Sequence, residues 1–149
     1  MTEVLFYHLQ NAPLERVLPD LLERSLQRGW RAIVRAGSKE RLDALNNTLW
    51  TYRDESFLPH GMAEDGPPEL EPVLLTTETE NPNGANVLFL VDGAEPGEVD
   101  GYERCVLMFD GRDAEAVGAA RNHWKTLKEA GHDTTYWQQS DAGKWEKKA

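Results

Sequence analysis

Residues 3–36 read EVLFYHLQNAPLERVLPDLLERSLQRGWRAIVRA, and this stretch decides the fold. Its first part, residues 3–9, is a run typical of a buried strand. Residues 11–28 then repeat leucine and valine at helical spacing on one face, and Gly29 ends the helix. Residues 31–36 form a second short apolar strand. A strand, a helix and a second strand in this order favour a parallel sheet.

The rest of the chain continues this alternation. Gly37 and Ser38 supply a turn and an N-cap for a second helix. That helix spans residue 39 to about Trp50, and a loop rich in Gly, Pro and acidic residues is predicted at 60–72. The elements predicted after it are strands at 73–77, 86–91 and 104–110, a helix at 114–130 and a strand at 134–139. Pro19 removes a backbone donor within the first helix and predicts a kink or a late start.

We therefore predict an α/β fold in one domain over residues 1–139, with a tail at 140–149. The domain is expected to be Rossmann-like, an open and mainly parallel sheet with helices on its faces. The turn after the first strand, residues 8–13, holds no glycine that would let a backbone approach a pyrophosphate, and no Walker sequence occurs. The fold is thus expected to lack the nucleotide-binding glycine loop and any cofactor.

Charge is distributed unevenly along the chain. The net charge is -10, which argues against broad adsorption to nucleic acid or to anionic membranes. Residues 1–120 hold 10 Lys and Arg against 22 Asp and Glu, whereas residues 121–149 hold 6 against 4. The basic side chains therefore collect toward the C-terminal end of an otherwise acidic protein.

Cysteine usage and hydropathy indicate the compartment. The single cysteine, Cys105, lies in an apolar run and cannot form an internal disulfide. The N-terminus lacks a basic region before its short apolar run, and no stretch approaches about 18 apolar residues. We expect a soluble, cytoplasmic protein that does not enter a membrane.

Catalytic and metal-binding patterns are weak. His60 has Asp54 and Glu55 nearby but no nucleophile or metal partner in the pattern, so a hydrogen bond within its loop is expected. His123 and His132 are nine residues apart and lack the spacing of a helical metal pair. No catalytic or metal-binding residue is predicted. A small nucleotide-dependent enzyme that uses His60 and a neighbouring acid remains an alternative.

Two segments have the composition of a binding site. Residues 49–61 read LWTYRDESFLPHG and place Trp50 at a helix end before a stiff loop. The helix at 114–130 places Arg121, Lys125 and Lys128 on one face, with Trp124 beside them. A cationic edge next to an aromatic side chain can capture a terminal carboxylate together with an apolar group. Taken alone, however, the tryptophan at residue 50 is more often a core residue, and such cations are often a solvated helix face.

Together these segments resemble the chi subunit family of bacterial DNA polymerase III. The resemblance runs through nearly the whole chain, and the Leu49 to His60 motif is its most specific part. It is carried by Phe6-Tyr7 in the first strand, Leu49-Trp50, Ser56-Phe57-Leu58-Pro59-His60, the set Arg121-x-x-Trp124-Lys125 and Trp137 in the last strand. The family often has tyrosine where this chain has Trp124.

The resemblance implies a non-catalytic subunit of a complex with DNA-directed DNA polymerase activity. Chi proteins have a Rossmann-like fold without a bound nucleotide. They pair with the psi subunit of the clamp loader and bind the acidic, Phe-ended C-terminal tail of single-stranded DNA-binding protein. DNA is then contacted mainly indirectly. No motif for a psi-binding surface can be matched in this chain.

The resemblance also assigns residues. It implies that Trp50, Arg121, Trp124 and Lys125 bind the partner's tail, and Lys128 joins them on the cationic helix face. Residues that would brace the loop beside this site are Phe57, Pro59 and His60. A further alternative is direct binding of single-stranded DNA by Trp124, Trp137 and Trp145 beside Lys144, Lys147 and Lys148, although the overall acidity weighs against it.

Overall fold

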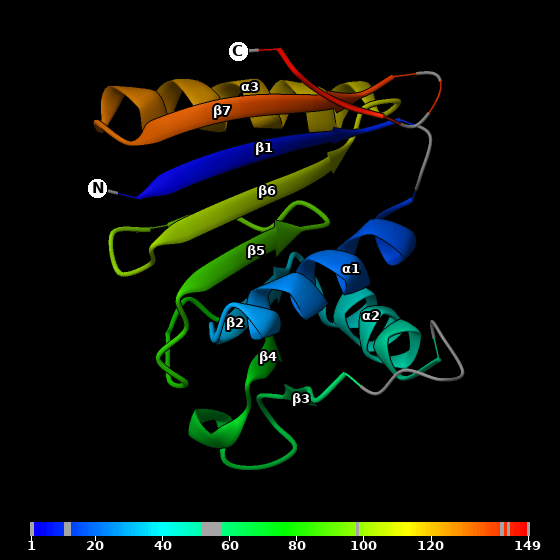
Figure 1. The fold of residues 1–149 in the computed structure, drawn as a ribbon, viewed down its shortest axis with the longest axis vertical. Coiled ribbons are helices and arrows are strands. Elements are labelled where there is room, and N and C mark those ends of the chain that lie inside the picture. The colour runs from blue at the N-terminus through cyan, green and yellow to red at the C-terminus, as the bar shows by residue number, and fades with distance from the viewer. Residues whose placement is uncertain are drawn as a thin grey trace.

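A computed structural model describes residues 2–10, 13–51, 58–97, 99–140, 142 and 144–148. Over these residues the chain is α/β, with an open eight-stranded sheet and three α-helices (Figure 1). The elements are β1 (Glu3–Leu9), α1 (Leu14–Gln27), β2 (Ala32–Ala36), α2 (Lys39–Thr51), β3 (Gly61–Met62), a 3-10 helix (Pro68–Leu70), β4 (Val73–Thr76), β5 (Val87–Val91), β6 (Arg104–Asp110), α3 (Ala114–Glu129), β7 (Asp133–Gln139) and β8 (Trp145–Lys147).

The strands follow the order β3-β4-β2-β5-β6-β1-β7-β8 across the sheet. All neighbouring strands are parallel except β7 and β8, which are antiparallel. The predicted α/β class with a mainly parallel sheet is therefore confirmed. β5 and β6 lie between β1 and β2, so the first two strands of the chain are not neighbours. α1 spans this separation and contacts both β2 and β6.

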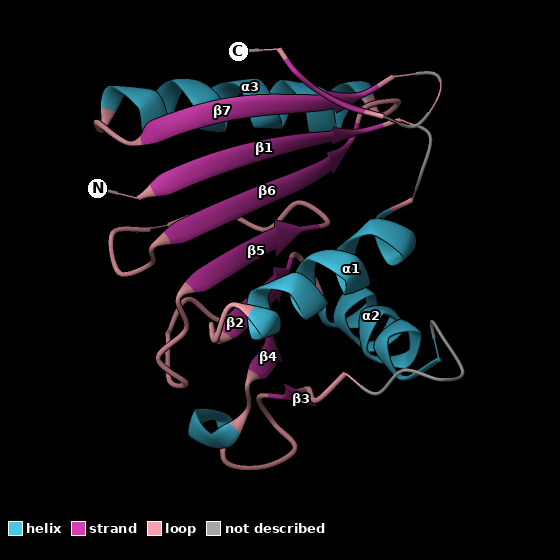
Figure 2. Cartoon of the chain, in the orientation of Figure 1, coloured by secondary structure: helices cyan, strands magenta, loops and turns pink. Residues whose placement is uncertain are grey.

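The helices cover opposite faces of the sheet (Figure 2). Along β1, Leu5, Tyr7 and Leu9 face the core that α1 and α2 complete, because successive side chains of a strand point to opposite faces. Val4 and Phe6 of the same strand face the core beneath α3. α2 packs on β2 and β4, whereas α3 packs on β1, β6 and β7. α1 contacts β2 and β6, so β6 is covered by α1 on one face and by α3 on the other.

α1 begins at Leu14 with Pro13 as its N-cap, later than the start predicted at residue 11. Residues 11 and 12 lie outside the described residues. The helix continues through Pro19, whose ring is buried. Leu18 and Leu22 are fully buried and hold the helix to the sheet; burying each contributes about 1.5–3 kcal/mol.

Part of the C-terminal segment 140–149 joins the sheet. Trp145–Lys147 forms β8 and pairs with β7. The Trp145 ring lies 4.9 Å from the ring of Tyr7, centroid to centroid, and packs against the core. The buried aromatic contact explains why this short segment extends the sheet.

None of the described helices has both the length and the apolar character that crossing a lipid bilayer requires.

Candidate functional site

α3 presents its cationic side chains on an exposed face. The Asp113 side chain caps the helix by accepting hydrogen bonds from the backbone N–H groups of residues 115 and 116. Ala120 and Leu127 are buried against the sheet. Arg121, Lys125 and Lys128 are exposed, and no ion pair is recorded for any of them within the described part of the chain. On a protein with a net charge of -10, these three exposed cations form a local basic surface.

An aromatic cluster adjoins these cations. The half-buried Trp124 ring meets Phe6 edge-on at a centroid distance of 5.3 Å and Tyr136 at 6.0 Å. The ammonium group of Lys128 lies 5.7 Å from the Trp124 ring centroid, within reach of a cation–π attraction. The structure therefore brings Arg121, Trp124, Lys125 and Lys128 together on one helix surface, with Tyr136 of β7 beside them. We call these five residues the α3 surface.

His8 of β1 contacts the α3 surface through Tyr136. Its Nδ1 lies 2.6 Å from the hydroxyl of Tyr136, and its ring packs on Phe109 with centroids 5.2 Å apart. Nε2 is buried without a hydrogen-bond partner among the described residues. A Cβ at Gly111 would collide with this imidazole, so the loop after β6 can cover His8 only because residue 111 is glycine.

The positive charge of Arg121 influences the pKa values of His8 and Tyr136. Burial lowers the pKa of His8, Asp110 opposes that shift, and the positive charge of Arg121 adds to it. Burial raises the pKa of Tyr136, and Arg121 opposes that shift. The Arg121 guanidinium thus lies close enough to act on both rings. Sequence reasoning missed His8 and Tyr136, although their strands showed aromatic residues.

Trp50 does not belong to the α3 surface, and its assignment to the same binding site is corrected here. It ends α2, which packs on β2 and β4 on the opposite face of the sheet from α3. Leu49 is buried against the core, and Trp50 is 51% exposed. β5 lies between the strands that α2 contacts and those that α3 contacts, and the thickness of the sheet separates the two helices.

The loop after α2 holds the Trp50 ring. His60 is buried, and its Nδ1 lies 2.6 Å from the carbonyl oxygen of Leu58, to which it donates. Its ring lies 4.4 Å from the Trp50 ring, centroid to centroid. His60 therefore makes the hydrogen bond within its loop that the sequence predicted. Pro59 lies between these residues, and Phe57 falls outside the described residues.

A cleft opens at the carboxyl ends of β1, β5 and β6, where Rossmann-like folds bind nucleotides. It encloses about 680 Å³. At this point β1 leads to α1 on one face and β6 leads to α3 on the other. The acidic side chains that line it are Glu15, Asp92, Glu95, Asp110, Asp113 and Glu115, against only Arg41 and Arg112.

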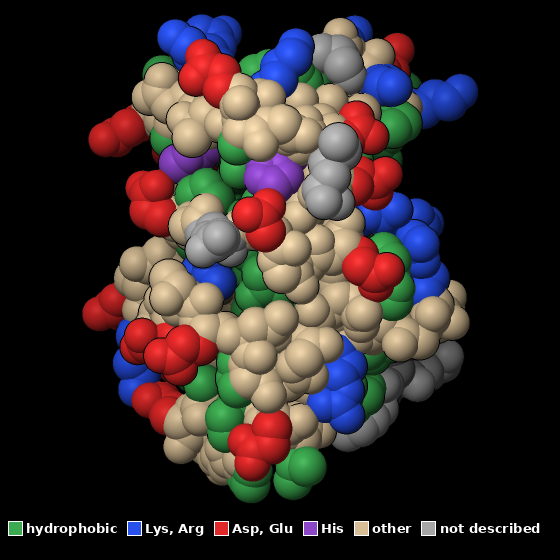
Figure 3. Space-filling model, turned by 90° about the vertical axis from the view of Figure 1, so that its left-hand side faces the viewer, with side chains coloured by type: hydrophobic (Ala, Val, Ile, Leu, Met, Phe, Trp, Pro, Cys, Tyr) green, Lys and Arg blue, Asp and Glu red, His purple; other side chains and the backbone are tan. Residues whose placement is uncertain are grey.

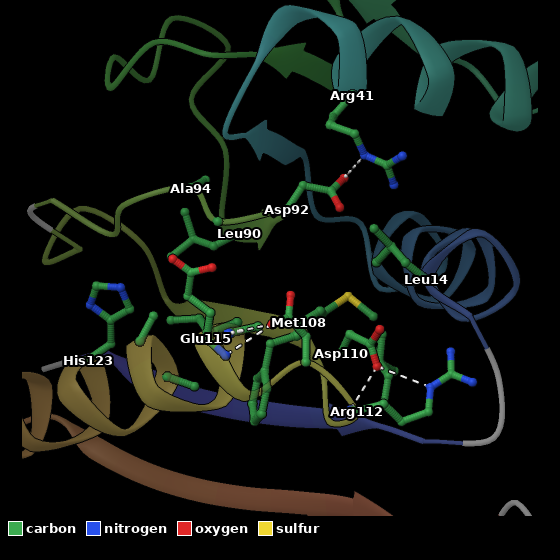
Figure 4. Close-up of a pocket in the computed structure, with 18 of the residues that line it drawn as sticks. Leu14, Arg41, Leu90, Asp92, Ala94, Met108, Asp110, Arg112, Glu115 and His123 are labelled. Carbon is green, nitrogen blue, oxygen red and sulfur yellow. Dashed lines mark hydrogen bonds and ion pairs between the residues drawn. The ribbon is translucent and has the colours of Figure 1, made fainter.

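Both arginines of this cleft are already paired (Figure 4). Nε of Arg41 lies 3.2 Å from Oδ2 of Asp92, and Nε of Arg112 lies 3.4 Å from Oδ1 of Asp110. A phosphate group placed here would face the remaining carboxylates without a free cation. The cleft is therefore a poor nucleotide site, and this weighs against the alternative of a nucleotide-dependent enzyme.

Metal and nucleophile chemistry finds little support in the described segments. They contain no group of three or more His, Cys, Asp or Glu side chains placed to hold a metal ion. His123 and His132 each approach one carboxylate instead, at 3.7 Å and 3.5 Å. Cys105 is fully buried, and burial raises the pKa of its thiol to about 12, so it is not a nucleophile in the folded chain.

Comparison with known proteins identifies the family. The model of the family "DNA polymerase III chi subunit, HolC" matches residues 1–135. A "DNA polymerase III subunit chi" of Pseudomonas aeruginosa is 27% identical over 135 residues, which cover 89% of this chain and 93% of that protein. A "Probable DNA polymerase III subunit chi" of Rickettsia prowazekii is 27% identical over 99 residues, 66% of this chain and 60% of that protein. The match thus spans less than two thirds of the Rickettsia protein. The chain belongs to the DNA polymerase III chi subunit family.

Proposed function

We propose that this protein is a non-catalytic adaptor of the DNA polymerase III holoenzyme. Its family is that of a DNA polymerase III subunit, so the chain is a DNA replication protein. In this proposal the α3 surface binds the acidic C-terminal tail of single-stranded DNA-binding protein, and a second surface binds the psi subunit or an equivalent part of the clamp loader. Contact with DNA through this route is indirect.

The observation that carries the tail-binding proposal is the set of exposed cations on one face of α3. Arg121, Lys125 and Lys128 are exposed, and no ion pair is recorded for them among the described residues. The net charge of the protein is -10, so an acidic tail is favoured only where basic side chains gather, and α3 carries three of them on one face.

The aromatic side chains supply the apolar part of the proposed site. Trp124 is half-buried and meets Tyr136 edge-on, so an incoming phenylalanine ring can add to an existing cluster. A buried aromatic side chain removes about 150–250 Å² from water. The terminal carboxylate of the same residue would pair with Arg121, whose guanidinium can accept it in bidentate geometry. Ordering a flexible tail offsets much of this gain, so affinity on the order of 1 µM is expected.

Trp50 supports the second surface. It is one of two large hydrophobic side chains exposed in the described segments, and His60 holds its ring from one side. Exposed tryptophan is enriched at protein interfaces. Because this residue lies on the opposite face of the sheet from α3, a clamp-loader subunit bound there would leave the α3 surface open. An adaptor needs this separation in order to hold two partners at once.

Fluorescence anisotropy with a labelled acidic peptide that ends in phenylalanine tests the tail-binding proposal. We expect binding that weakens as salt rises, and a loss of about tenfold or more in an Arg121→Ala variant, because a charge-assisted pair contributes about 1.5–3 kcal/mol. Arg16→Ala is the matched control, since Arg16 is an exposed arginine on α1. A peptide with an amidated C-terminus should bind as weakly to the unmodified protein as the original peptide binds to Arg121→Ala. Equal affinity of Arg121→Ala and Arg16→Ala would rule out the α3 surface as the tail site.

A further inference from the structure

A hollow beside α1 has the opposite charge character from the strand-end cleft. It encloses about 400 Å³ between the C-terminal half of α1 and the amino-terminal parts of β1, β5 and β6. Its charged lining residues are Arg24, Arg28 and Arg104, and none of the residues that line it is acidic. We call this the arginine hollow. On a chain with a net charge of -10, three arginines around one hollow form a local site for an anion.

The sequence places these arginines around an aromatic centre. Arg24 and Arg28 are one helical turn apart at the end of α1. Burial raises the pKa of Tyr7, and the charges of Arg104 and Arg24 oppose that shift, so both guanidinium groups lie near its hydroxyl. Arg104 is also paired with Glu3 at 2.5 Å. The hollow keeps a net positive charge after this pair is counted.

Trp30 holds two of the guanidinium groups. The Arg28 Cζ lies 3.9 Å from the Trp30 ring centroid, and the Arg104 Cζ lies 5.2 Å from it. Stacking on a ring orients the planar guanidinium and leaves its N–H groups free at the edge. Two parallel N–H groups at the edge of a guanidinium can bind two oxygens of one phosphate group.

A row of aromatic side chains continues from the arginine hollow across the sheet. Tyr7, Trp137 and Lys147 are direct cross-strand partners on β1, β7 and β8, so their side chains share one face. Trp145 joins them through its ring contact with Tyr7. Trp137 is half-buried, and no ring contact is recorded for it within the described segments. In this view of the described chain no helix lies in front of β1 and β7 (Figure 2).

We propose that the arginine hollow and this aromatic row together form a binding site for single-stranded nucleic acid. Phosphate groups would pair with Arg24 and Arg28, while Arg104 stays paired with Glu3, and bases would stack on Trp137 and its neighbours. Sheet-borne aromatic side chains beside a cationic groove are the usual means of holding unpaired bases. Duplex DNA cannot offer its bases in this way, because they are stacked within the helix.

The site is local rather than a general property of the surface. The amino-terminal edge of the sheet carries basic side chains in separate groups with acidic side chains between them (Figure 3). Non-specific affinity should therefore be modest, on the order of 10 µM at moderate salt. The site does not rest on the tail-binding proposal, because Tyr7 and Trp137 face the side of the sheet opposite α3.

Anisotropy with a labelled oligo-dT of about 15 nucleotides tests the proposal on the full chain without other proteins. An Arg24→Glu, Arg28→Glu double variant should bind at least about tenfold more weakly, and its slope of log affinity against log salt should be shallower by about 1.4, the value for two lost phosphate contacts. Trp137→Ala should lose about 5- to 100-fold, the effect of one stacked base. The single variant Arg24→Glu should also bind more weakly than Arg16→Glu on α1, which is its charge-matched control, and Arg121→Ala should bind the oligonucleotide like the unmodified protein.

Three results would overturn the proposal, provided that circular dichroism shows each variant to be folded. The first is that the unmodified protein does not bind the oligonucleotide at low salt. The second is that the Arg16→Glu control loses as much affinity as the Arg24, Arg28 double variant, which would mean that binding depends only on the net charge of the protein. The third is that Trp137→Ala binds the oligonucleotide with unchanged affinity while inorganic polyphosphate and duplex DNA compete as well as the single strand does, which would exclude base stacking. If Arg121→Ala left the affinity for the acidic peptide unchanged, that result would contradict only the tail-binding proposal.

Discussion

The hydroxyl of Tyr136 lies 2.6 Å from Nδ1 of His8, and this pair ties β7 to β1 beneath the α3 surface. The residues are not direct partners in the strand register, where Phe6 faces Tyr136 and His8 faces Gln138. The hydrogen bond is therefore a diagonal one. It fixes both rings next to Arg121, whose charge adds to the lowering of the His8 pKa and opposes the raising of the Tyr136 pKa. Loss of this hydrogen bond should therefore destabilise the fold more than it weakens the proposed binding surface.

Replacing Tyr136 with phenylalanine removes the hydroxyl and keeps the ring. We expect a loss of about 1–2 kcal/mol in the free energy of unfolding, because His8 would be left with an unpaired nitrogen in a partly buried position. Urea denaturation followed by circular dichroism measures this change. Binding of the acidic peptide should weaken far less than in Arg121→Ala, since the aromatic wall remains. An unchanged denaturation midpoint would show that the hydrogen bond contributes nothing.

The pKa of His8 predicts a pH dependence. Burial lowers it below the ordinary value of 6.5, and Arg121 adds to the shift. The neutral imidazole is thus favoured in the folded state. The contribution of His8 to stability is full above pH 6.5 and is lost as the pH falls from 6.5 through the folded-state pKa, because the unfolded chain takes up the proton first.

Titration of the His8 ring by NMR tests this directly. The apparent pKa should lie below 6.5 and should rise in Arg121→Ala, because that variant removes a charge that lowers it. Arg16→Ala serves as the control for a lost arginine elsewhere. A His8 pKa at or above 6.5 in the unmodified protein would contradict the burial that the structure assigns to this ring.

The close approach of the loop to His8 predicts an intolerance at Gly111. A methyl group there would collide with the imidazole, so Gly111→Ala should destabilise the protein by about 1–3 kcal/mol through overpacking. Gly118→Ala is the matched control. Gly118 lies inside α3, and a Cβ there would meet nothing within 4 Å, so alanine should stabilise the helix by about 0.5–1 kcal/mol. Thermal unfolding of both variants should therefore shift in opposite directions.

Much of the fold could be predicted because its signals are local. The helical spacing of Leu18 and Leu22 and the N-cap at Asp113 identified α1 and α3 without knowledge of the tertiary structure. β8 was missed because three residues, Trp145–Lys147, are too few to show a period. What holds that strand is a contact between Trp145 and Tyr7, which are far apart in the sequence.

The candidate site was predicted in part for the same reason. Spacing along one helix placed Arg121, Lys125 and Lys128 on a common face, and the structure has them there. The grouping of Trp50 with them was wrong because it depends on the order of strands in the sheet. Sequence patterns do not state in which direction each crossover runs. The connections from β1 to β2 and from β2 to β4 run toward one edge of the sheet, whereas the connection from β6 to β7 runs toward the other, and right-handed crossovers then place α2 and α3 on opposite faces. The pairing of His8 with Tyr136 likewise depends on strand register.

Burial of Cys105 predicts a thiol that does not react in the folded protein. Its side chain is fully buried, and burial raises the pKa to about 12, opposed only weakly by the charge of Arg35. At pH 8 almost none of it would be thiolate, the reactive form. A thiol reagent such as Ellman's should modify no group in the native protein and one group per chain in concentrated urea. Rapid modification without urea would mean that β6 opens locally.

The position of Trp50 predicts that it acts independently of Arg121. The two side chains lie on opposite faces of the sheet, and distant sites with no shared partners are additive within about 0.3–0.5 kcal/mol. Trp50→Ala should therefore leave the affinity for the acidic peptide unchanged, and the double variant should bind it as weakly as Arg121→Ala alone. In the same preparation, Trp50→Ala should weaken capture of a clamp-loader subunit, whereas Arg121→Ala should not. If both variants weakened peptide binding, the two residues would have to share one site after all, and the separation that an adaptor requires would be lost.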